Sequence, residues 1–167
     1  VENQATADAR IPLLLRTPAA VRFVSYEPAL GPVLLDDRHM IGAEEYWDFL
    51  KGSRGPTCQH VAIRPESTAH LDWVIVGGES GTGARPFELA WAASMIWQCR
   101  TAGVACFVKQ LGASPCIDRQ GERRAFQLCD RKGCDPAEWP EKLRVREWPA
   151  APPAGHGGLA LEDGSRG

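Results

Sequence analysis

The sequence predicts an α/β fold and, within that class, the C-terminal part of a parallel β/α barrel that is TIM-like but partial. Two near-continuous apolar segments, residues 71–76 and 104–108, lie on either side of a helical pattern at residues 89–102. A third apolar segment, residues 20–26, is rich in β-branched and aromatic residues. Apolar strands that alternate with helices are typical of parallel sheets covered on both faces.

Composition and charge are those of an ordinary globular protein. The chain has 167 residues, 44% hydrophobic and 24% charged, which is enough for one domain with a core. Its net charge of −2 gives no global basic field of the kind that nucleic-acid-binding proteins carry. No apolar run approaches the roughly 18 residues that a membrane span needs, and the first residues do not resemble a signal peptide. We therefore expect a cytoplasmic protein without a membrane partner.

The first part of the chain predicts one helix and one strand. Residues 1–4 read as the end of a strand, and residues 5–16 carry apolar side chains at helical spacing. Pro12 either opens a short helix there or kinks a longer one. The strand at residues 20–26 runs into Glu27, and residues 33–35 would extend it after a turn.

The middle of the chain predicts an insertion followed by a strand, a helix and a strand. Residues 36–70 are irregular and look like an insertion between core units, with a short helix expected at residues 43–50. The strand at 71–76 ends at a glycine-rich sequence, Gly77-Gly78-Glu79-Ser80-Gly81. The helix that follows ends before Gly103, a natural C-cap, and the last strand ends in Lys109-Gln110.

The C-terminal part differs in composition from the core. Residues 119–148 are charged and rich in turn formers, with a short helix expected at 136–142 and an extended piece at 143–147. From residue 149 onward, alanine, proline and glycine predict disorder. We therefore expect a β/α half-barrel core at 1–112 with an insertion at about 36–70, a C-terminal extension at 113–148 and a disordered tail at 149–167.

Polar residues follow each predicted strand at the same relative place. Because ligands bind at the carboxyl ends of parallel strands in barrels and open sheets, these residues predict one mouth for a cofactor or substrate. Glutamates gathered there raise one another's pKa values unless a cation offsets them. Polar residues are also normal wherever a strand leaves a core. The predicted mouth consists of Glu2, Asn3, Glu27, Gly77, Gly78, Glu79, Ser80, Arg85, Lys109 and Gln110, of which Arg85 and Lys109 are the available cations.

The glycine-rich sequence at residues 77–81 is the most specific local feature. Adjacent glycines allow a ligand to approach backbone N–H groups closely. The sequence matches neither the dinucleotide-binding fingerprint nor a phosphate-binding P-loop. It also fails the nucleophile-elbow pattern, and no histidine is clearly placed beside Ser80 to activate it. A tight turn with no further role is the alternative interpretation.

The six cysteines predict free thiols rather than a metal site. Disulfides are unusual in a cytosolic chain, and Cys99 and Cys106 fall in apolar patterns typical of buried thiols. Cys129 and Cys134 are spaced wrongly for a zinc knuckle. The histidines form no metal-binding pattern, and the tryptophans of the predicted helix, Trp91 and Trp97, are assigned to packing.

Four segments together resemble a known family. In chain order they are AVRFVSYEPALGPV, LDWVIVGGESGTGARP, VACFVKQLG and DPAEWPEKLRVREWP. They resemble the C-terminal half of a phage- and prophage-associated family of uncharacterised proteins, over most of residues 1–148 apart from the insertion. Longer members of that family begin with a three-cysteine motif that looks like the cluster-binding motif of radical S-adenosylmethionine enzymes.

The resemblance implies the later part of a full or partial β/α barrel. The strand ends at Glu2-Asn3, Glu27 and Gly78-Glu79 would line a cofactor or substrate mouth, and an N-terminal half would hold a [4Fe–4S] cluster. This chain has no such three-cysteine motif, so the resemblance implies a catalytically incomplete part of an enzyme that uses S-adenosylmethionine. A half barrel exposes apolar strand edges, so we expect self-association or a need for the missing half.

Two other classes of function stay open at this point. One is an inactive remnant. The other is a module that binds nucleic acid or protein, and nucleic-acid binding would weaken steeply with salt. Acidic residues dilute the basic run on which this alternative rests, and a solvated surface is the commoner outcome of such mixed charge. The basic residues are Arg119, Arg123, Arg124, Arg131, Lys132, Lys142, Arg144 and Arg146.

Overall fold

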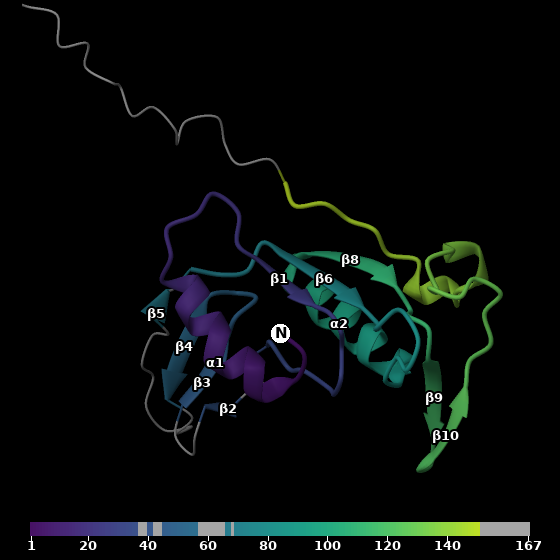
Figure 1. Cartoon of the computed structure of the whole chain (residues 1–167). Coiled ribbons are helices and arrows are strands. Elements are labelled where there is room, and N and C mark those ends of the chain that lie inside the picture. The colour runs from purple at the N-terminus through teal and green to yellow at the C-terminus, as the bar shows by residue number, and fades with distance from the viewer. Residues whose placement is uncertain (37–39, 42–44, 57–65, 68, 151–167) are drawn as a thin grey trace, which may run out of the picture.

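A three-stranded parallel sheet lies at the centre of the computed structural model (Figure 1). The structure describes residues 1–36, 40–41, 45–56, 66–67 and 69–150. The central strands are β1 (Phe23–Tyr26), β6 (Trp73–Gly77) and β8 (Ala105–Gln110), in the order β1-β6-β8. The mixed α/β class is therefore confirmed. No sheet in the described part of the chain closes into a barrel.

Helix α1 (Gln4–Leu15) begins at a capping box rather than after a strand. The Asn3 side chain accepts a hydrogen bond from Thr6 N, and the Thr6 hydroxyl accepts one from the backbone of Asn3. Such reciprocal bonds satisfy N–H groups that a helix start otherwise leaves unpaired. Residues 1–4 are therefore not a strand end, because Gln4 already belongs to the helix. Pro12 lies inside the helix, so its position matches the longer of the two predicted helices.

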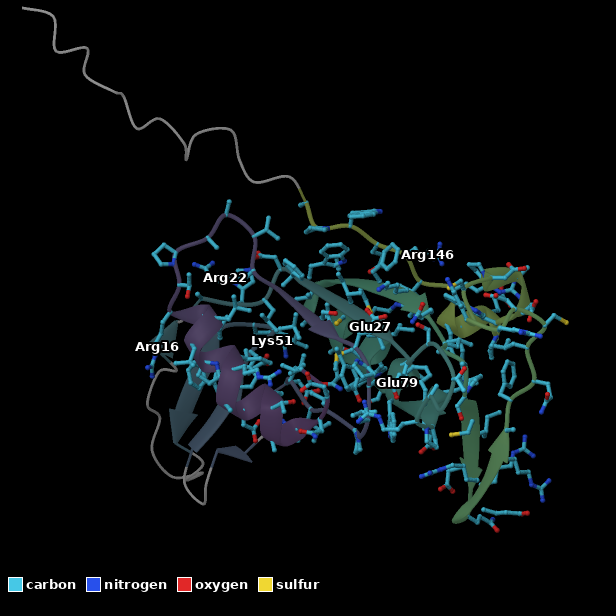
Figure 2. All side chains as sticks on the ribbon, viewed as in Figure 1. Arg16, Arg22, Glu27, Lys51, Glu79 and Arg146 are labelled. Atoms are coloured by element: carbon cyan, nitrogen blue, oxygen red, sulfur yellow. The ribbon has the colours of Figure 1, made fainter. Side chains whose placement is uncertain are left out.

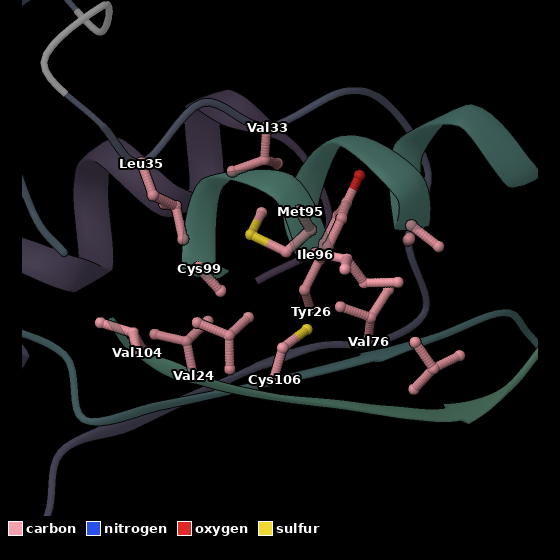
Figure 3. Packing of buried hydrophobic residues seen from close by; sticks show 14 of the residues in the cluster. Val24, Tyr26, Val33, Leu35, Val76, Met95, Ile96, Cys99, Val104 and Cys106 are labelled. Atoms are coloured by element: carbon pink, nitrogen blue, oxygen red, sulfur yellow. The ribbon is translucent and has the colours of Figure 1, made fainter. Parts of the chain in front are cut away.

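Helix α2 (Leu89–Ala102) forms over the predicted residues and covers one face of the central sheet. It ends at Gly103, whose φ of +74° is the left-handed conformation that glycine adopts most easily. Figure 3 shows Met95, Ile96 and Cys99 of this helix above side chains from all three central strands. Trp97, predicted to pack, is 53% exposed, because it lies on the outer face of the helix.

A buried glutamine joins α2 to the segment that follows β1. The Gln98 side chain accepts a hydrogen bond from Leu35 N at 2.7 Å and donates one to Val33 O at 3.0 Å. Residues 33–35 therefore do not extend the sheet as predicted. They pack over α2, where Val33 and Leu35 are buried (Figure 3).

The described part of the insertion forms a small antiparallel sheet. Of the helix predicted at residues 43–50, residues 45–48 are a strand instead, and residues 43–44 lie outside the described residues. Aromatic residues favour strands, and pairing across the sheet here outweighs the helical propensity of glutamate. The Asp48 side chain then ends the strand by accepting hydrogen bonds from Leu50 N and Lys51 N. The strands, in the order β2-β3-β4-β5, are β2 (Met40–Ile41), β3 (Glu45–Asp48), β4 (Ser53–Pro56) and β5 (Glu66–Ser67).

No helix in the described part of the chain covers the face of the central sheet opposite α2, which corrects the expectation of two covered faces. The chain after residue 143 runs along the outer edge of β8, where Arg146 forms an antiparallel bridge with Phe107. Trp148 packs on Trp73 with 4.9 Å between ring centroids. At the other side of the face, Phe23 in β1 stays 50% exposed.

The C-terminal extension contains a hairpin that the sequence analysis did not predict. Strands β9 (Pro115–Arg119) and β10 (Glu122–Ala125) are joined by Gln120 and Gly121, both with positive φ. β9 also pairs with the short strand β7 (Phe87–Glu88). The helix predicted at 136–142 is two 3-10 turns, Pro136–Glu138 and Glu141–Leu143, because Pro140 interrupts the backbone hydrogen bonding between them.

Residues 151–167, where disorder is predicted, lie outside the described residues. Among the described residues, neither α1 nor α2 has the length and apolar character that crossing a bilayer requires.

Candidate functional site

The carboxyl ends of the three parallel strands form one edge of the sheet. Glu27 follows β1, Gly78 and Glu79 follow β6, and Lys109 lies near the end of β8. Figure 2 shows Glu27 and Glu79 on the side toward which the strands point. We call this group, together with Gly77 and Arg85, the carboxyl edge.

An ion pair crosses the middle strand of the sheet. The Lys109 Nζ atom on β8 lies 2.9 Å from Oε2 of Glu27, which follows β1 at the far side of β6. The side chains can meet because Gly77 lies between them. A Cβ atom at this position would lie 3.0 Å from Oε1 of Glu27. The glycine therefore makes room for the ion pair.

Both members of this pair reach solvent. The Glu27 side chain is 18% exposed and that of Lys109 is 54% exposed. An ammonium group has three N–H donors, and a carboxylate can accept several hydrogen bonds. The pair therefore keeps donors and acceptors that a polar ligand could use.

A second ion pair holds the loop that follows β6. Arg85 makes two hydrogen bonds of 2.9 Å to the carboxylate of Glu79, through Nε and Nη2. The backbone N–H of Arg85 donates a third, also of 2.9 Å. These hydrogen bonds lower the pKa of Glu79 to about 2 and raise the pKa of Arg85. Glu79 is therefore a permanent anion near neutral pH and cannot serve there as a general acid.

Glu2 lies close to the Glu79–Arg85 ion pair, whereas Asn3 caps helix α1. Burial acts to raise the pKa of Glu2, but hydrogen bonds with Thr6 and Arg10 outweigh it, and the pKa is lowered. Arg10 Nη1 lies 3.1 Å from the Glu2 carboxylate. The charge of Glu2 also helps to raise the pKa of Arg85. Asn3 uses its side-chain oxygen to cap α1.

Gln110 and Gly78 hold the strand ends together. Gln110 is buried and donates a hydrogen bond from Nε2 to Gly78 O at 2.9 Å. Its Oε1 accepts a contact of 3.4 Å from the thiol of Cys134. A Cβ atom on Gly78 would lie 2.3 Å from Leu111 O, so the two backbones approach more closely than any side chain allows. Both residues position the edge rather than face a ligand.

Ser80 has no geometry that would activate it. Its side chain is exposed and makes no hydrogen bond with any described residue. The described histidine, His70, pairs with Asp72 near the start of β6, at the opposite end of the sheet.

A larger cavity lies at that opposite end of the sheet. Its volume is about 820 Å³, and it is lined by residues near the amino ends of β6 and β8, including Asp72, Arg100 and Trp148. Two of its polar side chains already have partners, Lys51 with Asp48 and His70 with Asp72. Because parallel sheets bind ligands at the carboxyl ends of their strands, we favour the carboxyl edge as the site.

The described residues contain no group of three or more histidine, cysteine or acidic side chains that could hold a metal ion. Cys99 and Cys106 are buried as predicted, and their mutual hydrogen bond together with burial raises the pKa of Cys99. Cys116 is buried too, whereas Cys129 and Cys134 are exposed.

A smaller cavity beside the carboxyl edge was missed by the sequence analysis. We call it the loop cavity. Its volume is about 560 Å³, and the loops after β6, β8 and β10 surround it. The adjacent cations Arg131 and Lys132 are a sequence signal for an anion-binding site. Their position near the glycine-rich loop, however, depends on the β9–β10 hairpin, which the sequence did not predict. The polar and charged residues that line the cavity are Thr82, Ser114, Gln127, Asp130, Arg131 and Lys132.

Comparisons with known proteins place the chain at the level of a family. No curated protein and no solved structure gives a significant match. A family model described as "Protein of unknown function (DUF5131)" matches residues 1–138, which is most of the chain, and the protein therefore belongs to the DUF5131 family.

Proposed function

We propose that the carboxyl edge is part of the ligand-binding mouth of a radical S-adenosylmethionine-like enzyme. In this proposal the chain provides the C-terminal part of a partial barrel and is catalytically incomplete by itself. The relation to phage proteins that the sequence resemblance implies belongs to the same proposal. The observation that carries it is the Glu27–Lys109 pair, which crosses Gly77 at 2.9 Å.

The paired charges suit a zwitterionic ligand. S-adenosylmethionine carries an α-amino group and an α-carboxylate on one carbon. The Glu27 carboxylate can accept hydrogen bonds from the amino group, and the ammonium of Lys109 can donate to the carboxylate. Gly77 has no Cβ atom, which would lie 3.0 Å from Oε1 of Glu27, so the strand between β1 and β8 does not crowd the pair. These are the contacts that the amino-acid end of such a ligand needs.

The arrangement of helices and strands also supports a partial barrel. Helices α1 and α2 each precede a strand of the parallel sheet, as βα units do. Val1 N donates a hydrogen bond of 2.7 Å to Ser25 O, so the segment that enters α1 lies against β1.

An iron–sulfur cluster does not fit the described residues. Such a cluster supplies the electron that cleaves S-adenosylmethionine, and cysteine thiolates hold it. Two of the described cysteines are exposed, and no three of them gather with one another. We therefore assign this chain the ligand mouth only and derive no step from the cluster.

Calorimetric titration with two ligands tests the proposal. S-adenosylhomocysteine has the amino-acid group, and 5′-methylthioadenosine has the same nucleoside without it. We expect the full chain to bind the first at least tenfold more tightly. Lys109→Gln and Gly77→Ala should each remove that preference, because a hydrogen bond between charged groups contributes about 1.5–3 kcal/mol, or roughly 10- to 100-fold in affinity.

Two variants serve as controls, one for the loss of a positive charge and one for the substitution of a glycine. Lys142→Gln removes an exposed lysine from a 3-10 turn in the C-terminal extension. Gly31→Ala adds a Cβ atom whose nearest described neighbour is 3.8 Å away. Both should bind like the wild type. Failure of the wild type to bind S-adenosylhomocysteine, or equal binding by Lys109→Gln, would contradict the proposal.

A further inference from the structure

Backbone hydrogen bonds link the segments that surround the loop cavity. Ala113 N donates to Glu79 O at 2.8 Å, which ties the segment after β8 to the loop after β6. Leu111 N donates to Gly133 O at 2.9 Å, which ties the same segment to the chain that follows the hairpin. The cavity between these segments, about 560 Å³, is therefore fixed by hydrogen bonds rather than by side-chain packing alone.

The two cations of the loop cavity are unpaired, whereas its carboxylate is occupied. Arg131 and Lys132 are exposed and form no ion pair with any residue that the structure describes. Asp130 accepts hydrogen bonds from the backbone N–H groups of Cys134 and Lys132. These bonds lower the pKa of Asp130. Its oxygens are therefore committed to holding the loop. The charge of Lys132 also acts on Asp130, but neither cation makes an ion-pair contact with it, so both can contact a ligand.

Neutral hydrogen-bond donors complete the lining. Thr82 and Ser114 each bring a hydroxyl group to the cavity, and Gln127 brings an amide. None of these side chains forms a hydrogen bond with another described residue. Two cations with several neutral donors match a phosphate group, whose oxygens accept many hydrogen bonds and carry negative charge.

Positively charged residues extend from the loop cavity along the β9–β10 hairpin. Arg119 and Arg123 of β9 and β10 are exposed and make no ion pair with a described residue, whereas Arg124 pairs with Glu122 at 2.8 Å. The intervening Asp118 accepts a hydrogen bond from Gly121 N at the turn. The acidic residues that dilute the basic run in the sequence are thus partly engaged in holding turns.

We propose that the loop cavity binds a phosphate group, either of a nucleotide or of a nucleic-acid backbone, through Arg131, Lys132, Thr82 and Ser114. This site goes beyond the proposed mouth and does not depend on it. It lies beside Glu79, so a ligand held there by its phosphate would extend toward the carboxyl edge.

Two binding measurements on the full chain test the phosphate site. Calorimetry compares ATP with adenosine, and fluorescence anisotropy follows a labelled 12-nucleotide single-stranded DNA at several salt concentrations. We expect ATP to bind and adenosine not to bind. The double variant R131Q/K132Q should weaken ATP and DNA binding at least tenfold, and Ser114→Ala should weaken ATP binding several-fold without a change in net charge.

The control is a double variant with the same loss of charge elsewhere. Arg16→Gln with Lys142→Gln removes two exposed cations outside the cavity and should leave ATP affinity unchanged. An equal loss of ATP affinity in this control, or no ATP or DNA binding by the wild type, would overturn the proposal.

The results also separate the two sources of phosphate and the two proposed sites. Much tighter binding of DNA than of ATP, with a steep loss at high salt, would identify a nucleic-acid backbone. Comparable affinities would identify a free nucleotide. Because S-adenosylhomocysteine has no phosphate, its binding should be unaffected by R131Q/K132Q, and ATP binding should be unaffected by Lys109→Gln.

Discussion

Glu79 shows how one ion pair fixes the charge of a residue at the carboxyl edge. Three hydrogen bonds from Arg85 reach its carboxylate, and the pKa of Glu79 falls from 4.5 to about 2. A carboxylate whose pKa is lower in the folded state stabilises the fold above its unfolded pKa. That contribution is lost as pH falls from about 4.5 toward 2.

We predict that breaking this pair raises the pKa of Glu79. In Arg85→Gln, NMR titration should find the pKa of Glu79 raised from about 2 toward its ordinary value of 4.5, although the backbone N–H of residue 85 still holds it below that value. Glu79→Gln should lower the free energy of unfolding at pH 7, and the difference from the wild type should shrink as pH approaches 2, as measured by urea denaturation. Arg124→Gln, which breaks the exposed Glu122 pair, serves as the control. An unchanged titration of Glu79 in Arg85→Gln would show that the pair does not control its charge.

At the residue scale, the sequence identified the charges of the site but not their pairing. Lys109 and Arg85 were predicted to offset the glutamates, and the structure pairs them with Glu27 and Glu79. Lys109 can pair with Glu27 only because β6 lies between β1 and β8 and because Gly77 has no side chain. No local sequence pattern encodes this strand order. Asn3 was predicted in the mouth, but local hydrogen bonding with Thr6 makes it a helix cap.

At the scale of elements, the close approach of the ends of β6 and β8 positions the whole edge. Gly78 N donates to Gln110 O at 3.1 Å, and the Gln110 side chain donates back to Gly78 O. This double link is only possible where residue 78 has no side chain, because Leu111 O would lie 2.3 Å from a Cβ atom.

We predict that Gly78→Ala destabilises the fold by at least about 2 kcal/mol, because a backbone clash cannot relax as a side-chain clash does. Urea denaturation measures the change. Gly31→Ala is the matched control and should change stability little, since its Cβ atom meets only an ordinary contact at 3.8 Å. Equal stabilities of Gly78→Ala and the wild type would mean that the two strand ends do not meet as described.

The predicted elements that match the structure are those whose apolar residues recur with a regular period. Helix α2 has a continuous apolar face and a glycine C-cap, and its predicted bounds match the structure. The hairpin of β9 and β10 was missed because its turn uses Gln120 at a φ of +58°, where asparagine or glycine is the usual signal. The helix predicted at residues 43–50 failed for another reason, because pairing across the small sheet, and not local propensity, fixes the strands there.

At the scale of the whole molecule, the open face of the central sheet is the feature with the clearest consequence. β1 is an outer strand of this sheet, and its Phe23 is half exposed on the face opposite α2. Exposed aromatic residues on an edge strand favour association with other chains.

We therefore predict that the isolated chain self-associates through β1. Sedimentation velocity should show oligomers of the wild type at micromolar concentrations and a shift toward monomer in Phe23→Lys. Leu13→Lys changes another exposed apolar residue, on α1, and should leave the distribution unchanged. A wild-type chain that sediments as a monomer, or an equal effect of both variants, would contradict association through β1.

The sequence by itself determined the mixed α/β class, the helix at residues 89–102, the central strands within a few residues and the charges at their ends. These follow from local periodicity and from the change from apolar to polar residues at each strand end. Only the tertiary structure decided that Lys109 reaches Glu27 across Gly77, that the described part of the insertion is a sheet and that Arg131 and Lys132 line a cavity beside the glycine-rich loop. Each of these depends on contacts between residues far apart in the chain, where the strand order and close backbone approach, rather than local propensity, set the geometry.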